Sequence, residues 1–187
     1  GELEGHAEQI TRLQQERFEA VTRSHRGRGL QRHLANSAGT LRDRSLHHDL
    51  VRVGLALYGH APSAQFEKRL DLQPAMTVKA RVSLIREVAA GVGVSYGHRF
   101  VTSRASRMAV IGIGYADGVS RCLSGRIHAL HKGKTLPQVG AITMDQLMLD
   151  VTDHPELEIG DVVTLLGQDE QQVIRPQDWA ALSDSIP

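Results

Sequence analysis

Residues 33–39 form the first of four short segments whose residue types could bind an anion or move a proton. The segment contains Asn36, Ser37 and Gly39, so it offers a hydroxyl and closely approachable backbone amides. Such groups suit a phosphate. The same residues are equally typical of an Asn-Ser turn in which the glycine relieves strain. The composition of the segment does not decide between a phosphate site and an ordinary turn.

The second segment, residues 51–55, places Arg52 in an otherwise apolar stretch. A guanidinium is permanently charged and needs a partner if it is buried, so a structural ion pair is one interpretation. A binding site is the other. Gly54 and Leu55 would present backbone N–H groups at the C-terminal end of a strand, where α/β barrels build their sites.

The remaining segments carry tyrosines and carboxylates. Tyr96 stands between a serine and a glycine, and residues 111–118 and 139–146 contain Asp117 and Asp145 near their ends. A tyrosine beside a glycine usually packs in a turn, and a phenol is a poor base at neutral pH unless positive charge stabilises its phenolate. The Gly-x-Gly of residues 112–114 without a following helix is too common to indicate a nucleotide loop.

The first sixty residues alternate between helical and strand patterns. A helix is predicted over residues 8–24, because its apolar residues lie on one side: Ile10, Leu13, Phe18 and Val21. A strand over 30–35, a loop over 36–40, a helical turn over 41–48 and an apolar strand-like segment over 50–59 follow. A complete eight-stranded α/β barrel needs about 250 residues. We therefore expect residues 1–61 to be an incomplete barrel remnant.

From residue 62 to residue 187 the pattern changes to short strands with period-two alternation. It begins with the segment 76–84 and is interrupted by turn signals such as Gly160-Asp161. Further strands are predicted over 108–113, 126–131, 147–151, 162–166 and 171–174, and a helix over 176–183. This pattern is typical of a mainly antiparallel β domain, either a small barrel or a sandwich.

Composition excludes several classes of protein. Lys and Arg number 22 against 21 for Asp and Glu, so no net charge attracts nucleic acid or an anionic membrane. Cys122 is the only cysteine, which excludes an internal disulfide and favours a reducing cytoplasm. No apolar run approaches the roughly 18 residues of a membrane span. We expect a cytoplasmic protein that binds small molecules and has no metal site.

In their order and spacing, the four segments resemble alanine racemase. The resemblance extends from about residue 8 to the end and rests on five strings: His-x-Ala-Asn-Ser-Ala, Val-Arg-x-Gly-x-Ala-Leu-Tyr-Gly, Val-Ser-Tyr-Gly, Gly-Tyr-Ala-Asp-Gly and Met-Asp-Gln. It implies a pyridoxal-phosphate α/β barrel followed by a β domain. It also implies a head-to-tail homodimer whose sites are shared between subunits, and the interconversion of L- and D-alanine for peptidoglycan precursors.

The resemblance assigns a role to each candidate residue. Tyr96 would be the base on the L face of the substrate, opposite a lysine that also holds the cofactor. Met144 would meet the substrate carboxylate through its backbone amide, and Tyr115 would line the substrate path. The residues assigned to the cofactor are His33, Asn36, Ser37, Arg52, Gly54 and Leu55. Arg52 would face the pyridine nitrogen, and His33 would support the network or be a buried structural histidine.

The sequence also departs from the family pattern. None of its lysines, Lys68, Lys79, Lys132 and Lys134, matches the position that binds the cofactor. We therefore expect a fragment of the racemase that is inactive alone. Two other functions remain open: a non-catalytic β-domain module that binds a racemase subunit, and a racemase of serine or another amino acid.

Overall fold

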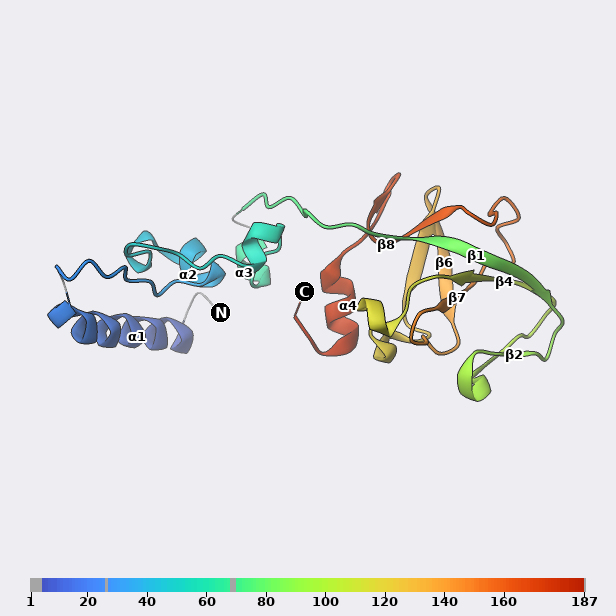
Figure 1. Ribbon diagram of the computed structural model, residues 1–187, viewed down its shortest axis with the longest axis horizontal. Coiled ribbons are helices and arrows are strands. Elements are labelled where there is room, and N and C mark those ends of the chain that lie inside the picture. The colour runs from blue at the N-terminus through green and yellow to red at the C-terminus, as the bar shows by residue number, and fades with distance from the viewer. Residues whose placement is uncertain (1–4, 26, 68–69, 187) are drawn as a thin grey trace. The chain divides into compact units, whose positions relative to one another are not determined.

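The computed structural model describes residues 5–25, 27–67 and 70–186. It divides into an N-terminal unit, Gly1–Ala75, and a C-terminal unit, Met76–Pro187, each with its own buried cluster (Figure 1). Among the described residues, no helix has the length and apolar character that crossing a membrane requires. A domain boundary after residue 61 remains our prediction.

The N-terminal unit is mainly helical. Its elements are α1 (His6–Thr22), α2 (Ser37–Arg42), α3 (Ala64–Glu67) and the 3-10 turns η1 (Arg23–His25), η2 (Arg44–Leu46) and η3 (Leu55–Tyr58). The helix predicted over residues 8–24 is confirmed as α1. None of the residues of α1 is buried, and Ile10, Leu13 and Val21 are exposed. The described part of this unit therefore leaves the apolar side of α1 largely uncovered.

The strands predicted over 30–35 and 50–59 are wrong, apart from a single contact. Asn36 and Arg52 form an isolated parallel bridge, in which the Arg52 N–H donates to the Ala35 carbonyl at 2.8 Å. A β ladder needs repeated backbone hydrogen bonds between two segments, and these segments form only this isolated bridge. Leu55 to Tyr58 instead close into η3, where the Leu57 N–H donates to the Gly54 carbonyl.

The described residues of the C-terminal unit form nine strands and one longer helix. The strands are β1 (Val78–Val88), β2 (Gly93–Val94), β3 (Phe100–Val101), β4 (Ser106–Ile111), β5 (His128–His131), β6 (Lys134–Val139), β7 (Leu147–Asp150), β8 (Val162–Asp169) and β9 (Gln172–Ile174). Short 3-10 turns lie between them, η4 (Tyr96–His98), η5 (Tyr115–Asp117) and η6 (Arg121–Leu123), and the helix α4 (Pro176–Ser183) follows. The antiparallel β domain that the sequence predicted is confirmed.

Six of these strands close into a barrel in the order β1-β4-β7-β6-β5-β8, with β8 returning to β1. Strand β1 closes it because its two halves have different partners: Val78 to Arg81 pair with β8, and Val82 to Val88 pair with β4. The register shifts between Val82 and Leu84. An irregularity of this kind bends a strand, which lets one strand serve two sides of the barrel.

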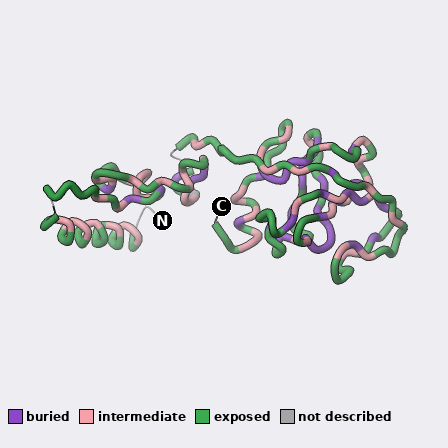
Figure 2. The backbone as a smooth tube through the Cα atoms, viewed as in Figure 1, coloured by how far each residue is buried: buried purple, intermediate pink, exposed green. Residues whose placement is uncertain are grey.

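The barrel is filled by the inward side chains of its strands. Figure 2 shows that the buried backbone is concentrated in this unit. Ala109 and Ile111 of β4, Leu147 and Leu149 of β7 and Leu165 of β8 have no exposed surface. Full burial of one such Leu or Ile side chain stabilises a fold by about 1.5–3 kcal/mol. This core holds the loops between the strands, where the candidate residues lie.

The sequence predicted most of these strands and the final helix, but it missed β2, β3 and β6. Strand β6 contains a proline and the buried Gln138, both unfavourable in a strand pattern. The structure satisfies the Gln138 amide locally, since its Nε2 donates to the Val139 carbonyl at 2.9 Å and to the Gly140 carbonyl at 3.0 Å. Pairing with β5 and β7 then stabilises the strand.

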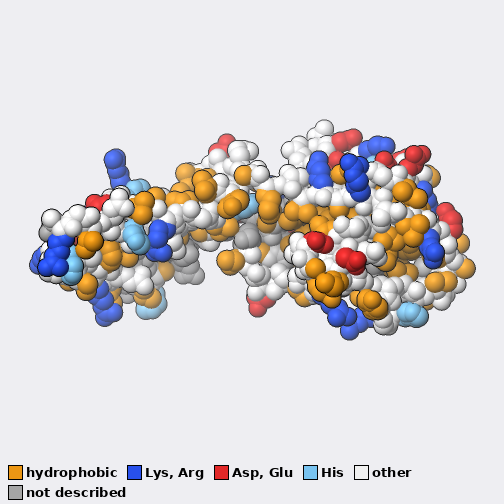
Figure 3. Space-filling view, viewed as in Figure 1, with side chains coloured by type: hydrophobic (Ala, Val, Ile, Leu, Met, Phe, Trp, Pro, Cys, Tyr) orange, Lys and Arg blue, Asp and Glu red, His pale blue; other side chains and the backbone are white. Residues whose placement is uncertain are grey.

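Basic and acidic side chains lie interspersed on the visible face of the C-terminal unit (Figure 3). In one such pair, the Lys134 ammonium donates to the Glu156 carboxylate at 2.6 Å. This hydrogen bond is the main cause that lowers the pKa of Glu156 from 4.5 to about 2. The His154 ring is 4.0 Å from the same carboxylate.

A carboxylate with a lowered folded-state pKa stabilises the fold above its unfolded pKa, and the contribution is lost as pH falls through the folded value. Lys134→Met should therefore reduce the free energy of unfolding slightly at pH 6, and the difference from the wild type should vanish between pH 4.5 and about 2. Urea unfolding at several pH values measures it, with the exposed Lys132→Met as control. A difference that persists at pH 2 would contradict this assignment.

Candidate active site

Tyr96 lies on an exposed turn between β2 and β3. Its side chain is 70% exposed. Three residues of this turn have positive φ: Ser95 (62°), Gly97 (72°) and His98 (46°). Ser95 combines this φ with a ψ of −171°, a region that is essentially restricted to glycine and costs other residues about 1–3 kcal/mol. The backbone of the turn, rather than packing of the ring, therefore sets the direction of Tyr96.

The Tyr96 turn packs against residues 139–146, which we call the linking segment. The Ser95 hydroxyl donates to the Ala141 carbonyl at 2.7 Å. Gly140, with a φ of 68°, comes so close to the turn that a Cβ there would lie 2.8 Å from the Val94 carbonyl oxygen. A side chain at position 140 would push the two segments apart.

Tyr115 and Met144 meet through the same linking segment. The Tyr115 N–H donates to the Thr143 carbonyl, and the Ala116 N–H donates to the Met144 carbonyl, both at 2.9 Å. A Cβ on Gly114 would lie only 2.3 Å from the Thr143 carbonyl oxygen. Two backbone hydrogen bonds and a glycine contact thus join the loop of Tyr115 to that of Met144.

The structure therefore attaches three candidate residues that are distant in sequence to one short piece of backbone. Tyr96, Tyr115 and Met144 all expose their side chains, at 70%, 47% and 61%. They are available to a small molecule or to another chain. Sequence reasoning missed Ser95 and Gly114, which hold this arrangement together. The only sequence signals for them were their places beside the tyrosines.

Asp117 has a structural role in the Tyr115 loop. Its Oδ2 accepts the Gly114 N–H at 3.0 Å and so caps η5. Among the described residues, no group of three or more His, Cys, Asp and Glu side chains is placed to hold a metal ion.

In the N-terminal unit, Asn36, Ser37 and Gly54 come together. The predicted loop at 36–40 begins helix α2 instead, because Asn36 caps it by accepting the Gly39 N–H at 3.0 Å. The Ser37 side chain is buried, and its oxygen accepts the N–H groups of Gly54 at 3.1 Å and Ala56 at 3.3 Å. The starts of α2 and η3 thus meet at this hydroxyl.

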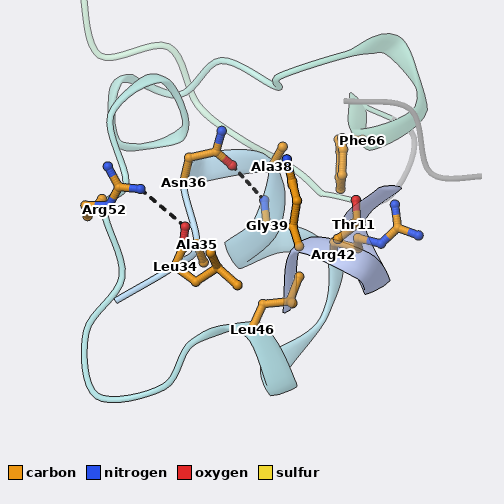
Figure 4. A pocket seen from close by; sticks show the side chains of 11 residues that line it. Thr11, Leu34, Ala35, Asn36, Ala38, Gly39, Arg42, Leu46, Arg52 and Phe66 are labelled. Atoms are coloured by element: carbon orange, nitrogen blue, oxygen red, sulfur yellow. Dashed lines mark hydrogen bonds between the residues drawn. The ribbon is translucent and has the colours of Figure 1, made fainter. Parts of the chain in front are cut away.

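Arg52 lies beside this cluster but is not buried. Its guanidinium is exposed and donates to the Leu34 carbonyl at 3.3 Å (Figure 4). Among the described residues it forms no ion pair. Arg52 and Asn36 also line a pocket of about 280 Å³, whose other walls are Thr11, Gln14, Leu34, Ala35, Ala38, Gly39, Arg42, Leu46 and Phe66.

His33 and Leu55 stand apart from that pocket. His33 is exposed, so a buried structural histidine is wrong, and it lines a different hollow with Phe18 and Leu30. Leu55 is partly buried at the start of η3, next to Gly54.

The described lysines all lie in the C-terminal unit. Lys79 is exposed on β1, and Lys132 and Lys134 are exposed at the β5–β6 hairpin. Lys68 lies outside the described residues.

Two family models match the chain. The model described as "Alanine racemase, N-terminal domain" matches residues 3–62, and "Alanine racemase, C-terminal domain" matches residues 75–187. The chain is 56% identical to an alanine racemase of Prochlorococcus marinus over 188 residues, which cover 100% of this chain and 49% of that protein. It spans about half the length of the curated relatives it matches.

Solved structures agree. The alanine racemase of a D-cycloserine-producing Streptomyces lavendulae is 40% identical, with a TM-score of 0.82 over 94% of this chain and 47% of that one. The Bartonella henselae alanine racemase, with covalently bound pyridoxal phosphate, is 36% identical, with a TM-score of 0.72 over 82% of this chain and 41% of that one. The resemblance drawn from the motifs is confirmed, and this chain belongs to the alanine racemase family.

Proposed function

We propose that the chain supplies part of the machinery of an alanine racemase that interconverts L- and D-alanine in the cytoplasm. The observation that carries this proposal is the attachment of Tyr96, Tyr115 and Met144 to one linking segment. A racemase needs an acid–base group at Cα and groups that orient the substrate. These three exposed residues supply both kinds of group from one rigid β domain.

Tyr96 is the proposed base for the proton on the L face. A phenolate can take up a proton at its oxygen and the resulting phenol can return it, which is general acid–base catalysis. Its exposure leaves it accessible to a substrate held outside its own unit, which supports this proposal. We propose that this substrate lies in the barrel of a partner subunit, so that the working form is a homodimer.

The residues of the N-terminal unit fit the phosphate of pyridoxal phosphate. Both lone pairs of the Ser37 oxygen accept backbone N–H groups, which leaves its proton for a phosphate oxygen. The helix starts at Asn36 and Gly54 favour negative charge nearby. Gly54, Leu55 and Asn36 would complete these contacts, Arg52 would face the ring nitrogen, and His33 would support the network.

When bound, pyridoxal phosphate supplies a sink for the electron pair that is left when Cα loses its proton. The guanidinium of Arg52 does not readily give up a proton, so it would hold the ring nitrogen unprotonated and limit that sink. Two-base racemisation also needs a base on the D face. None of the lysines of this sequence matches the family position for that base, so we propose that a segment outside these 187 residues provides it.

A chimera tests the proposal directly. The 188 aligned residues of the Prochlorococcus marinus enzyme are replaced by this chain, and racemisation of L-alanine, D-alanine and L-serine is followed by circular dichroism. We expect racemisation of alanine, with serine turned over more slowly. A folded chimera that takes up cofactor but racemises neither substrate would contradict the proposal, and a preference for serine would replace alanine with serine as the substrate.

The chain by itself should not racemise alanine when pyridoxal phosphate is added, because it contributes only one of the two bases. The same circular dichroism assay measures this, with the chimera as positive control. Mixing the chain with an intact racemase subunit also tests the non-catalytic alternative, since a binding module should associate with that subunit without adding activity. Turnover by the chain alone at the chimera's rate would show that a second base lies within it.

A further inference from the structure

Ser95 adopts a backbone conformation that is unusual for any residue with a side chain. Its φ of 62° and ψ of −171° lie in a region that glycine occupies and other residues avoid. A serine in this position is therefore held by its surroundings. Such strain is often found where a protein fixes a functional group.

Two sets of contacts hold Ser95. On one side, its hydroxyl donates to the Ala141 carbonyl at 2.7 Å. On the other, the preceding Val94 is buried and pairs with Phe100, packed near Met108 and Val139. The residue is thus anchored before the turn by a strand pair and at the turn by one side-chain hydrogen bond.

Tyr96 follows Ser95 directly and has little packing of its own, since its side chain is 70% exposed. The direction of its Cα–Cβ bond consequently depends on the backbone at Ser95. The hydrogen bond from Ser95 ends on the linking segment, three residues before Met144. It therefore fixes the Tyr96 turn relative to the piece of backbone that carries Met144.

We propose that Ser95 is a positioning residue that holds the Tyr96 phenol in register with Met144 through its hydrogen bond to Ala141. This inference rests on the proposed function for the role of Tyr96, but the positioning itself can be tested without activity. Ser95 does not touch the substrate. It acts through the backbone that Tyr96 shares with it.

Two substitutions separate positioning from strain. Ser95→Gly removes the hydroxyl but suits the backbone conformation, whereas Ser95→Ala removes the hydroxyl and keeps the strain. If the hydroxyl only compensates for strain, Ser95→Gly should behave like the wild type. If the hydroxyl positions Tyr96, both substitutions should release the turn. The glycine variant also keeps the test decisive if the alanine variant folds poorly.

The first measurement uses the 187-residue chain and needs no cofactor. The sequence has three tyrosines, so a sample labelled with ¹³C in its tyrosine rings gives one set of signals for each. In both Ser95 variants, the chemical shifts of the Tyr96 ring should change because the turn leaves its position against the linking segment, while those of Tyr58 stay unchanged. The exposed Ser103→Gly serves as control and should leave all three sets in place.

The second measurement uses the chimera. Both Ser95 variants should lower kcat by about ten- to a hundredfold, the loss expected when a catalytic group is displaced by about an ångström, with little change in KM. The Cα-deuterium isotope effect with L-alanine should rise, because proton removal by Tyr96 becomes slower. A merely smaller folded fraction would lower kcat without changing the isotope effect.

The two measurements distinguish failure of the positioning role from failure of the proposed function. Unchanged Tyr96 signals in Ser95→Gly would overturn the positioning role, whether or not the chimera is active. If the Tyr96 signals move in the Ser95 variants of the chain while the chimera with unchanged Ser95 is inactive, that result would support positioning and contradict the proposed function. Moved signals with unchanged kcat and isotope effect in an active chimera would overturn the catalytic consequence of positioning.

Discussion

Tyr96→Phe in the chimera is expected to lower kcat in both directions by about 10²- to 10⁴-fold, the usual contribution of a general acid–base group. Each turnover must remove a proton on one face and add one on the other, so losing one base blocks the reaction from either enantiomer. The phenol is 70% exposed, so removing its oxygen should leave stability unchanged. Circular dichroism of alanine measures the rate, and thermal unfolding measures stability.

Exchange of the Cα proton of alanine with solvent distinguishes the base on the L face from the base on the D face. In heavy water the Tyr96→Phe chimera should still incorporate deuterium into D-alanine through the remaining base, but it should form almost no L-alanine. Tyr58→Phe, at another exposed tyrosine, is the matched control and should leave the rate unchanged. Racemisation at the wild-type rate by Tyr96→Phe would remove Tyr96 from the mechanism.

Gly114→Ala is expected to destabilise the C-terminal unit by about 3 kcal/mol, at the upper end for overpacked sites. The added Cβ would lie 2.3 Å from the Thr143 oxygen, 2.5 Å from the Met144 oxygen and 2.6 Å from the Asp145 nitrogen. These are all backbone atoms, so no side chain can rotate away and the two loops must separate. In the chimera KM for alanine should rise, because Tyr115 and Met144 would no longer be held together. Urea unfolding and steady-state kinetics measure both effects.

Gly112→Ala is the matched control, because no atom lies within 4 Å of a Cβ built there. It should unfold within about 0.5 kcal/mol of the wild type, as surface substitutions usually do. Equal losses from both substitutions would show that the effect comes from the flexibility of the chain at glycine rather than from contact with the linking segment.

Period-two patterns predicted the β domain well because each strand places alternate residues in one core. Strand β4 illustrates this, since Ala109 and Ile111 belong to the barrel core while Val110 between them is only partly buried. Strand β6 was missed because its buried Gln138 is satisfied there by hydrogen bonds to the Val139 and Gly140 carbonyls and from the Gly125 N–H. Such local compensation depends on the folded backbone and leaves no periodic signal.

In the N-terminal unit, strand-like composition predicted strands that the structure does not form. Residues 30–35 and 50–59 have the composition of strands, yet they form only the bridge between Asn36 and Arg52. A strand is stabilised by neighbours on its edges, and composition does not say whether those neighbours are present. The same bridge brings Ser37 next to Gly54 across 17 positions of the chain, a contact that composition does not predict.

By itself, the sequence determined the family, the mainly antiparallel β domain and the identities of the candidate residues, because motifs and alternation are local properties of the chain. Only the tertiary structure decided that Tyr96, Tyr115 and Met144 share one linking segment, and that Ser95 and Gly114 hold them there. These contacts join residues that are tens of positions apart. The contact between the Tyr115 loop and the linking segment arises because β4 pairs antiparallel with β7, with Ile111 opposite Leu147, so that the loop after β4 lies beside the segment before β7.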